Sequence, residues 1–241
     1  MPPLLTVEKL TLGFGNEVVL QDLDFTLQAQ ETLAILGRSG CGKTTLLKCL
    51  AGLQAPDAGD ILLAGNSILK QKPQERGIVY LYQEALLFPH LNVFENVAFG
   101  LRLRRESEAS VREQTGRLLE NLDLGTQAEK MPHQLSGGQK QRAAFGRALI
   151  INPCILLLDE PFGNLDVETR ASMQQLFRRV AAEYHITAVF VTHDLKEAVL
   201  MGTRLAYMEN GRLDLFDKLD AFVADPRTGM KQEIDFWKKL R

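Results

Sequence analysis

The strongest constraint on this sequence is a glycine-rich segment that stands between an apolar run and a helical pattern. The run before it, TLAIL, is typical of a buried strand, and TTLLKCL after it has the spacing of a helix. In this strand–turn–helix context the pattern GxxxxGKS/T predicts a phosphate-binding loop. The loop comprises Gly37, Arg38, Ser39, Gly40, Cys41, Gly42, Lys43 and Thr44, and Thr45 follows it.

Each residue type in this loop supplies part of a nucleotide phosphate site. Glycines let successive backbone N–H groups converge on phosphate oxygens because no Cβ stands in the way, and the helix start adds further N–H groups. We expect Lys43 to contact the β- and γ-phosphates and the Thr44 hydroxyl to ligate Mg²⁺. The alternative is a glycine-rich turn with an exposed lysine. Cys41 is interpreted as a small loop residue, with a redox role as the alternative.

Apolar runs alternate with helical patterns along the chain, which predicts an α/β fold. Up to about residue 30, apolar and polar residues alternate, as expected of antiparallel strands with one solvated face. The later runs TLAILG, GIVYLYQ, CILLLDE, ITAVFVTH and TRLAYM are typical of strands buried on both faces of a mostly parallel sheet. We therefore expect a P-loop NTPase fold with a mostly parallel sheet and an N-terminal antiparallel β subdomain.

Helical patterns cover residues 43–52, 107–124, 137–150, 167–184 and 195–200. Asp166 is a good N-cap for the helix that follows it, and Asp194 with Glu197 has the spacing of a capping box. Residues from about 90 to 150 contain helical patterns and no convincing strand, which indicates a helical subdomain inserted into the sheet domain. From about 213 to 241 we expect a short α/β tail.

Polar residues follow three of the predicted buried strands. The run 155–158 ends in Asp159 and Glu160, and Asp159 is the candidate to hold Mg²⁺ through a water. Glu160 is the candidate base for an attacking water. His193 should emerge at the same sheet edge and bond the γ-phosphate or the water, and the Gln83 amide can contact Mg²⁺ or the water. The alternatives are an acidic pair that opens a loop and a structural histidine.

The segment LSGGQ is a second candidate anion site, at the start of the helix to Ile150. Ser136 and Gln139 have the spacing of a capping box, which explains these two residues. It does not explain Gly137 and Gly138, which cost helix stability but let a ligand approach closely. Because one nucleotide already has its phosphates at residues 37–45, a second cluster of N–H groups suggests a contact to nucleotide held by another copy of the chain.

Composition and charge exclude several classes of protein. The 241 residues are 45% hydrophobic and 24% charged, which suits one globular domain over residues 1–241. The net charge of −2 gives no global attraction to nucleic acid or an anionic membrane. Three cysteines without CxxC spacing argue against disulfides or a cysteine zinc site. Without a run of ~18 apolar residues or a secretory signal, the expectation is a cytoplasmic protein that reaches a membrane through a partner.

The segments GRSGCGKTT, Gln83, LSGGQ, ILLLDE and His193, in that order, resemble the motifs of the ATP-binding cassette (ABC) ATPases over about residues 4–223. The resemblance implies the ABC ATPase fold, ATP and Mg²⁺ as cofactors, and ATP hydrolysis. It also implies a head-to-tail dimer in which each ATP lies between one copy's phosphate-binding loop and the other copy's LSGGQ. The implied roles are γ-phosphate binding in trans by Ser136, Gly137 and Gly138, Mg²⁺ binding by Asp159, water activation by Glu160, and stabilisation of the transferred group by His193.

Two features beyond these motifs bear on the resemblance. Phe14 lies where the family stacks an aromatic side chain on adenine, and the alternative is a plain core phenylalanine. Where the family usually has Ser-Ala-Leu-Asp after the acidic pair, this chain has Gly163-Asn164-Leu165-Asp166. This departure puts the details of the contact across the dimer in doubt, but not hydrolysis.

The loop after Gln83 is apolar, which suggests a groove for a partner. In ABC transporters this segment receives the coupling helix of the membrane subunit; the alternative is that the leucines pack the helical subdomain. The residues are Leu86, Leu87, Phe88, Pro89, His90 and Leu91.

The surrounding sequence resembles importer ATPases for polyamines, ferric iron, sulfate, molybdate or thiamine. It implies a peripheral protein on the cytoplasmic side of the cell membrane, with a solute-binding protein as an indirect partner. Many such ATPases carry a C-terminal regulatory domain. Because this chain ends at Arg241, we expect a compact relative, with a truncated chain as the alternative. The alternative functions are an exporter ATPase and an ABC ATPase acting on nucleic acid or the ribosome, although no nucleic-acid partner is expected.

Overall fold

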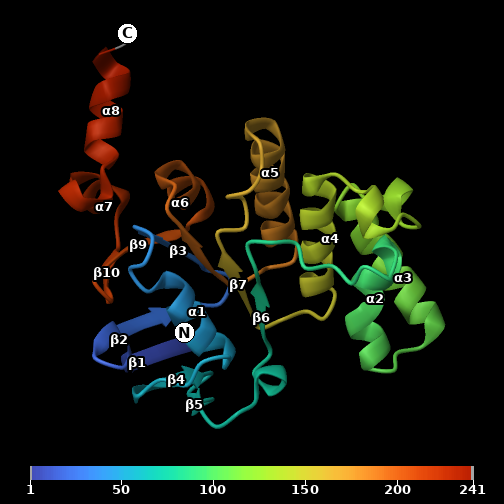
Figure 1. Cartoon of the computed structure of the whole chain (residues 1–241), viewed down its shortest axis with the longest axis horizontal. Coiled ribbons are helices and arrows are strands. Elements are labelled where there is room, and N and C mark those ends of the chain that lie inside the picture. The colour runs from blue at the N-terminus through green and yellow to red at the C-terminus, as the bar shows by residue number, and fades with distance from the viewer. Residues whose placement is uncertain (1, 240–241) are drawn as a thin grey trace.

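Two β-sheets organise the chain in the computed structural model, which describes residues 2–239 (Figure 1). The smaller sheet is antiparallel, with the strand order β2-β1-β4-β5. Its strands are β1 (Leu5–Phe14), β2 (Glu17–Leu27), β4 (Ala58–Leu63) and β5 (Asn66–Ser67). The first two strands are those that the sequence predicts. Strands β4 and β5 were not expected, because the short run ILL offers too few residues to show a period.

The larger sheet has six strands in the order β10-β9-β3-β8-β7-β6. All neighbours pair in parallel except β10, which is antiparallel to β9 at one edge. This confirms the predicted α/β class with a mostly parallel sheet. The strands are β3 (Thr32–Gly37), β6 (Ile78–Leu81), β7 (Ile155–Asp159), β8 (Ala188–Thr192), β9 (Arg204–Glu209) and β10 (Arg212–Phe216).

Helices lie around the sheets, and α-helices form the connections from β3 to β4, β6 to β7, β7 to β8 and β8 to β9. Figure 1 shows α2, α3 and α4 grouped beyond the β6 edge of the larger sheet, whereas α1 lies beside the antiparallel sheet. Residues 90–150 contain α2, α3 and α4, and the tail contains β10, α7 and α8. The helices are α1 (Lys43–Ala51), α2 (Val93–Leu103), α3 (Glu108–Asn121), α4 (Gly137–Leu149), α5 (Val167–Glu183), α6 (Leu195–Met201), α7 (Leu219–Ala224) and α8 (Met230–Lys239).

The larger sheet separates two hydrophobic cores. Along β3, Leu33 and Ile35 belong to the core shared with α1 and the antiparallel sheet, whereas Ala34 and Leu36 belong to the core on the other face. Every residue of β3 and β8 is buried, which explains why these strands have continuous apolar sequences without alternation. Packing on both faces therefore fixes the two strands, and this fixes the positions at which the loops that follow them begin.

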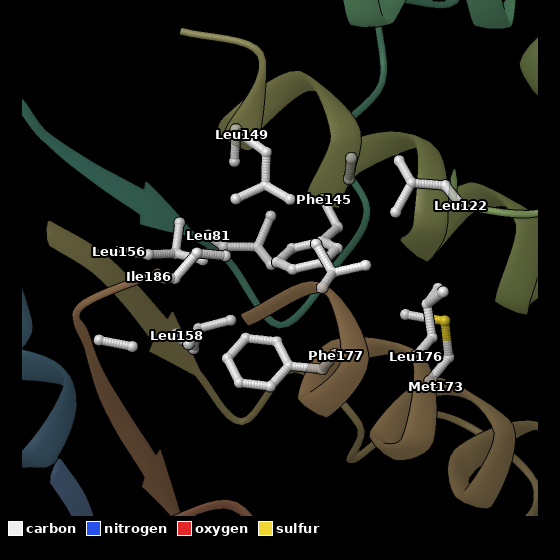
Figure 2. Close-up of a cluster of buried hydrophobic side chains, with 14 of the residues drawn as sticks. Leu81, Leu122, Phe145, Leu149, Leu156, Leu158, Met173, Leu176, Phe177 and Ile186 are labelled. Carbon is white, nitrogen blue, oxygen red and sulfur yellow. The ribbon is translucent and has the colours of Figure 1, made fainter. Parts of the chain in front are cut away.

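The second core joins the sheet to the helical group. In Figure 2, Leu156 and Leu158 of β7 face Phe145 of α4 and Phe177 of α5. The two phenylalanine rings lie 5.4 Å apart between centroids and are tilted by 38°, within the range of favourable aromatic pairs. This packing fixes α4, and with it the LSGGQ segment, against the end of the sheet.

The capping box expected at the start of α6 is only half formed. The Asp194 carboxylate does accept hydrogen bonds from the backbone N–H groups of Lys196 and Glu197. The Glu197 side chain, however, is buried and accepts a hydrogen bond from the Thr192 hydroxyl at 2.7 Å instead of closing the box. Burial raises the pKa of this carboxyl above its usual value. The Glu197 carboxylate therefore bonds the Thr192 hydroxyl and not the backbone N–H of Asp194.

Within residues 2–239, no helix combines the length and the apolar character that crossing a bilayer requires.

We predict that Phe145→Ala lowers the free energy of unfolding by about 3–5 kcal/mol, because it leaves a cavity beside Phe177 that the packed strands and helices cannot fill. Urea denaturation measures the change. The matched control is Leu103→Ala at the end of α2, where the side chain is 70% exposed, and its cost should stay within about 0.5 kcal/mol. Equal losses in both variants would contradict the assigned core.

Candidate functional site

The carboxyl edge of the larger sheet carries a recess of about 340 Å³. The loop 37–44 follows β3, the Asp159–Glu160 pair ends β7, and Gln83 comes just after β6. In open α/β sheets, ligands bind outside this edge. The recess is lined by Val19, Ser39, Gly40, Gly42, Lys43, Thr44, Thr45, Gln83, Asp159 and Glu160.

The loop conformation requires glycine at its end. Gly42 has φ +109°, and a Cβ there would lie 2.7 Å from the carbonyl oxygen of Val19. It is also the N-cap of α1 and provides no side chain to cap the helix. The first N–H groups of α1 have no partner within the helix and open onto the recess, as an anion-binding helix start requires.

Lys43 is folded back over this loop. Its Nζ donates hydrogen bonds to the carbonyl oxygens of Gly37 at 2.7 Å and Arg38 at 3.0 Å. The side chain is only 5% exposed, and Nζ lies 3.9 Å from Glu160 Oε1. The ammonium group is thus held between the loop and the acidic pair.

Asp159 is held from two sides by hydroxyl groups. The Thr44 hydroxyl donates to Asp159 Oδ1 at 3.0 Å, and the Tyr80 hydroxyl donates to Asp159 Oδ2 at 2.5 Å. Burial, followed by the bond to Asp159, raises the pKa of Tyr80 well above its usual value. No motif in the sequence predicted a role for Tyr80. The only signal in the sequence was a tyrosine hydroxyl within the apolar run GIVYLY. The structure places this strand beside β7, which ends in the two acids.

The Thr44 hydroxyl and the Asp159 carboxylate are chemically suited to bind Mg²⁺. A hydroxyl and a carboxylate are the oxygen ligands that this ion takes, and the substrate phosphates and waters supply the others. Among residues 2–239, no cluster of three or more His, Cys, Asp or Glu side chains is arranged to bind a metal by itself.

Glu160 lines the recess and pairs with His193, which lines a neighbouring hollow together with Arg38 and Ser39. His193 Nδ1 lies 2.8 Å from Glu160 Oε2, while Glu160 Oε1 faces Lys43. Glu160 has φ +45°, an uncommon conformation for a residue with a Cβ, and its N–H donates to Val191 of β8 at 3.1 Å. The glutamate is thereby turned away from Asp159, so the two neighbouring acids face different partners.

Gln83 turns toward the segment that departs from the family pattern. Its amide Nε2 donates to Asn164 Oδ1 at 3.4 Å, and a Cβ on Gly163 would lie 3.0 Å from this nitrogen. Gln83 lines the recess together with Thr44 and Asp159. The asparagine and glycine that replace Ala and Ser therefore contact the glutamine directly.

Ser136 and Gln139 form the capping box that the sequence allows. Ser136 Oγ accepts from the Gln139 N–H at 3.3 Å, and Gln139 Oε1 accepts from the Ser136 N–H at 3.0 Å. Gly138 has a packing reason as well, because a Cβ there would lie 2.5 Å from Thr169 Cγ2. Gly137 has no such neighbour, since the nearest atom, in Leu165, is 3.9 Å away.

Two interpretations of single residues are decided by burial. Phe14 is 52% exposed, so the alternative of a plain core phenylalanine is wrong. Cys41 is partly buried, and burial raises the pKa of its thiol. Since thiolate is the reactive form, this environment disfavours the redox alternative.

The apolar loop after Gln83 divides between packing and exposure. Leu87 packs against the core, whereas Leu86 is 53% exposed. The buried Asn96 amide bonds both the N–H and the carbonyl of Phe88, at 2.8 and 3.1 Å, and the Arg147 guanidinium lies 4.8 Å from the Phe88 ring centroid. Asn96 and Arg147 hold the loop in shape, and the sequence did not identify them because no local pattern shows that their side chains reach Phe88.

Comparison with known proteins agrees with this geometry. The sequence model of the family described as "ABC transporter" matches residues 20–163. The chain therefore belongs to the ABC transporter family, and its α/β architecture is the ABC ATPase domain that the motifs predict.

Individual relatives are similar over most of this chain. It is 44% identical to the sulfate/thiosulfate import ATP-binding protein CysA of Ralstonia nicotianae over 93% of the chain and 61% of that protein. It is 42% identical to the protein of the same name from Methylococcus capsulatus, over 93% of the chain and 66% of the relative. It is 44% identical to the protein of the same name from Rhodopseudomonas palustris, over 87% of the chain and 62% of the relative. The chain thus spans less than two thirds of the length of these relatives.

Proposed function

We propose that this chain binds and hydrolyses ATP as the ATP-binding subunit of an importer. The observation that carries the proposal is the convergence of a phosphate-binding loop, a hydroxyl–carboxylate pair and a Glu–His pair at one edge of the sheet. No single motif requires the others, and together they supply the groups that phosphoryl transfer to water needs. The names of the relatives support import over export.

In the proposed reaction, the N–H groups of loop 37–45 bind the phosphate oxygens and Lys43 leaves its carbonyl partners to contact the β- and γ-phosphates. Thr44 and Asp159 would hold Mg²⁺, with Gln83 beside them, and the ion would neutralise charge on the phosphates. Glu160 takes a proton from water as the water oxygen bonds to the γ-phosphorus and the bond to the bridging oxygen breaks. His193 holds Glu160 in place and stabilises the transferred group.

We further propose a head-to-tail dimer with ATP between the two copies. Ser136, Gly137, Gly138 and Gln139 would contact the γ-phosphate bound by the other copy. The space beside Gly137 supports this contact, because a phosphate group could approach the Gly137 backbone closely. Phe14 would stack on adenine, and its exposure is compatible with that role. In this proposal residues 1–241 form one ATPase domain, with a helical subdomain at about 90–150 and an α/β tail at about 213–241.

The proposed partner is a membrane permease that docks on the surface around Leu86, and a solute-binding protein would act through the permease. The chain would then be peripheral on the cytoplasmic side of the membrane. A net charge of −2 supports the absence of a nucleic-acid partner. The relatives' names favour sulfate or thiosulfate as cargo.

Glu160→Gln tests the catalytic part of the proposal. Loss of the base should slow ATP hydrolysis by at least about 10²-fold while ATP stays bound, because the amide keeps the shape of the side chain. The variant should therefore become dimeric with ATP in size-exclusion chromatography. Lys43→Ala is the control that should lose nucleotide binding and remain monomeric. A Glu160→Gln chain that stays monomeric at saturating ATP would contradict the sandwich.

Leu86→Ser tests the permease surface. Full burial of an exposed leucine contributes about 1.5–3 kcal/mol, and Leu86 is 53% exposed, so its loss should weaken membrane association roughly 4- to 12-fold. The measurement is the fraction of the chain recovered with membranes that contain the permease. Leu103→Ser, also exposed but on the far end of α2, should behave as wild type. Equal recovery of both variants would refute the assigned surface.

A further inference from the structure

Tyr80 makes a contact to the candidate metal site that the motifs do not account for. Strands β6 and β7 are parallel neighbours, and Tyr80 lies beside Leu157 in the register, two residues before Asp159. The side chain reaches along β7, and its hydroxyl donates to Asp159 Oδ2 at 2.5 Å. Thr44 donates to the other oxygen, Oδ1, at 3.0 Å. The carboxylate thus has one oxygen toward the phosphate-binding loop and the other toward β6.

The position of the Tyr80 ring is fixed by packing. The ring is partly buried against the core below the loop and lies 4.5 Å from the Tyr82 ring centroid. A hydroxyl placed in an apolar strand costs free energy unless it is hydrogen-bonded, and Asp159 supplies that bond. Because the ring cannot move far, the bond also limits rotation of the carboxylate.

A neutral donor suits this position. Tyr80 satisfies Oδ2 without cancelling the negative charge of Asp159, whereas a lysine or arginine there would pair with the carboxylate and compete with a cation. The bond leaves Oδ1 facing the Thr44 hydroxyl, and Thr44 and Asp159 are the two residues that the proposed function assigns to Mg²⁺. Groups that orient a metal ligand in this way commonly change metal affinity by 10–100-fold when removed.

We propose that Tyr80 is a positioning residue for the Mg²⁺ site, acting through Asp159. This inference rests on the proposed function, since it concerns the ion that accompanies ATP. Its role is to hold the Asp159 carboxylate in the orientation that presents Oδ1 beside Thr44.

The test compares Tyr80→Phe with Tyr82→Phe. Both changes remove one hydroxyl and keep the ring, but Tyr82 is 42% exposed, and its hydroxyl makes no hydrogen bond to any side chain or backbone group within residues 2–239. Binding of a fluorescent non-hydrolysable ATP analogue is measured first in EDTA and then as Mg²⁺ is added. Tyr80→Phe should raise the half-saturating Mg²⁺ concentration about tenfold and leave binding in EDTA unchanged. Tyr82→Phe should match wild type in both.

A second comparison shows whether the effect passes through Asp159. In an Asp159→Asn background, adding Tyr80→Phe should change the Mg²⁺ requirement by less than about twofold, because the orientated carboxylate is already gone. Should Tyr80→Phe fold poorly by circular dichroism, Tyr80→Leu lacks the same hydroxyl and should show the same rise.

Three results would overturn the inference. An unchanged Mg²⁺ requirement in the hydroxyl-free variants, with the analogue bound normally, refutes the positioning role alone. An equal loss of binding in EDTA shows that Tyr80 shapes the phosphate loop and not the metal site. If the wild-type chain binds the analogue neither with nor without Mg²⁺, the proposed function fails and the inference fails with it.

Discussion

The parallel pairing of β8 between β3 and β7 is the constraint on which the candidate site depends. In this register Leu36 lies beside Thr192, and Asp159 lies beside Val191. The three strands consequently end at one edge, and the loop, the acidic pair and the histidine that follow them meet there. Burial of both faces fixes the register, because a slip of one residue would move every side chain of a strand to the opposite core.

The two glycine-rich helix starts differ in how their N–H groups are satisfied. At α1 the N-cap is Gly42, without a capping side chain, so the helix start is open to an anion. At α4, Ser136 and Gln139 close a capping box within the chain. The two helix starts therefore differ: α1 has no capping side chain, whereas at α4 the backbone N–H groups of Ser136 and Gln139 already have partners within the chain.

Hydrogen bonds between side chains hold both Asp159 and Gln83 in place. Tyr80 and Thr44 hold the carboxylate from two sides, and Asn164 holds the glutamine amide beside it. Each is a hydrogen bond between side chains from different segments of the chain. Gly163 and Asn164, where the sequence departs from the family pattern, lie next to Gln83 of the same chain.

The sequence by itself determined the buried strands, the phosphate-binding loop and the helix starts. Each of these depends on residues close together in the chain: the glycines of loop 37–44, the run before Asp159, and the caps at Ser136 and Asp166. Their patterns can be interpreted without knowing what lies opposite. This is why the α/β class, the parallel sheet and the family could be predicted from the sequence alone.

Only the tertiary structure decided which partner each polar side chain takes. Strands β4 and β5 join the N-terminal sheet, Glu197 bonds Thr192 and not the backbone of its cap, and Tyr80 reaches Asp159. In the last case 79 positions separate the two residues. A buried polar group takes the best available partner in space, and that partner is set by how distant strands pair, which no local pattern of residues records.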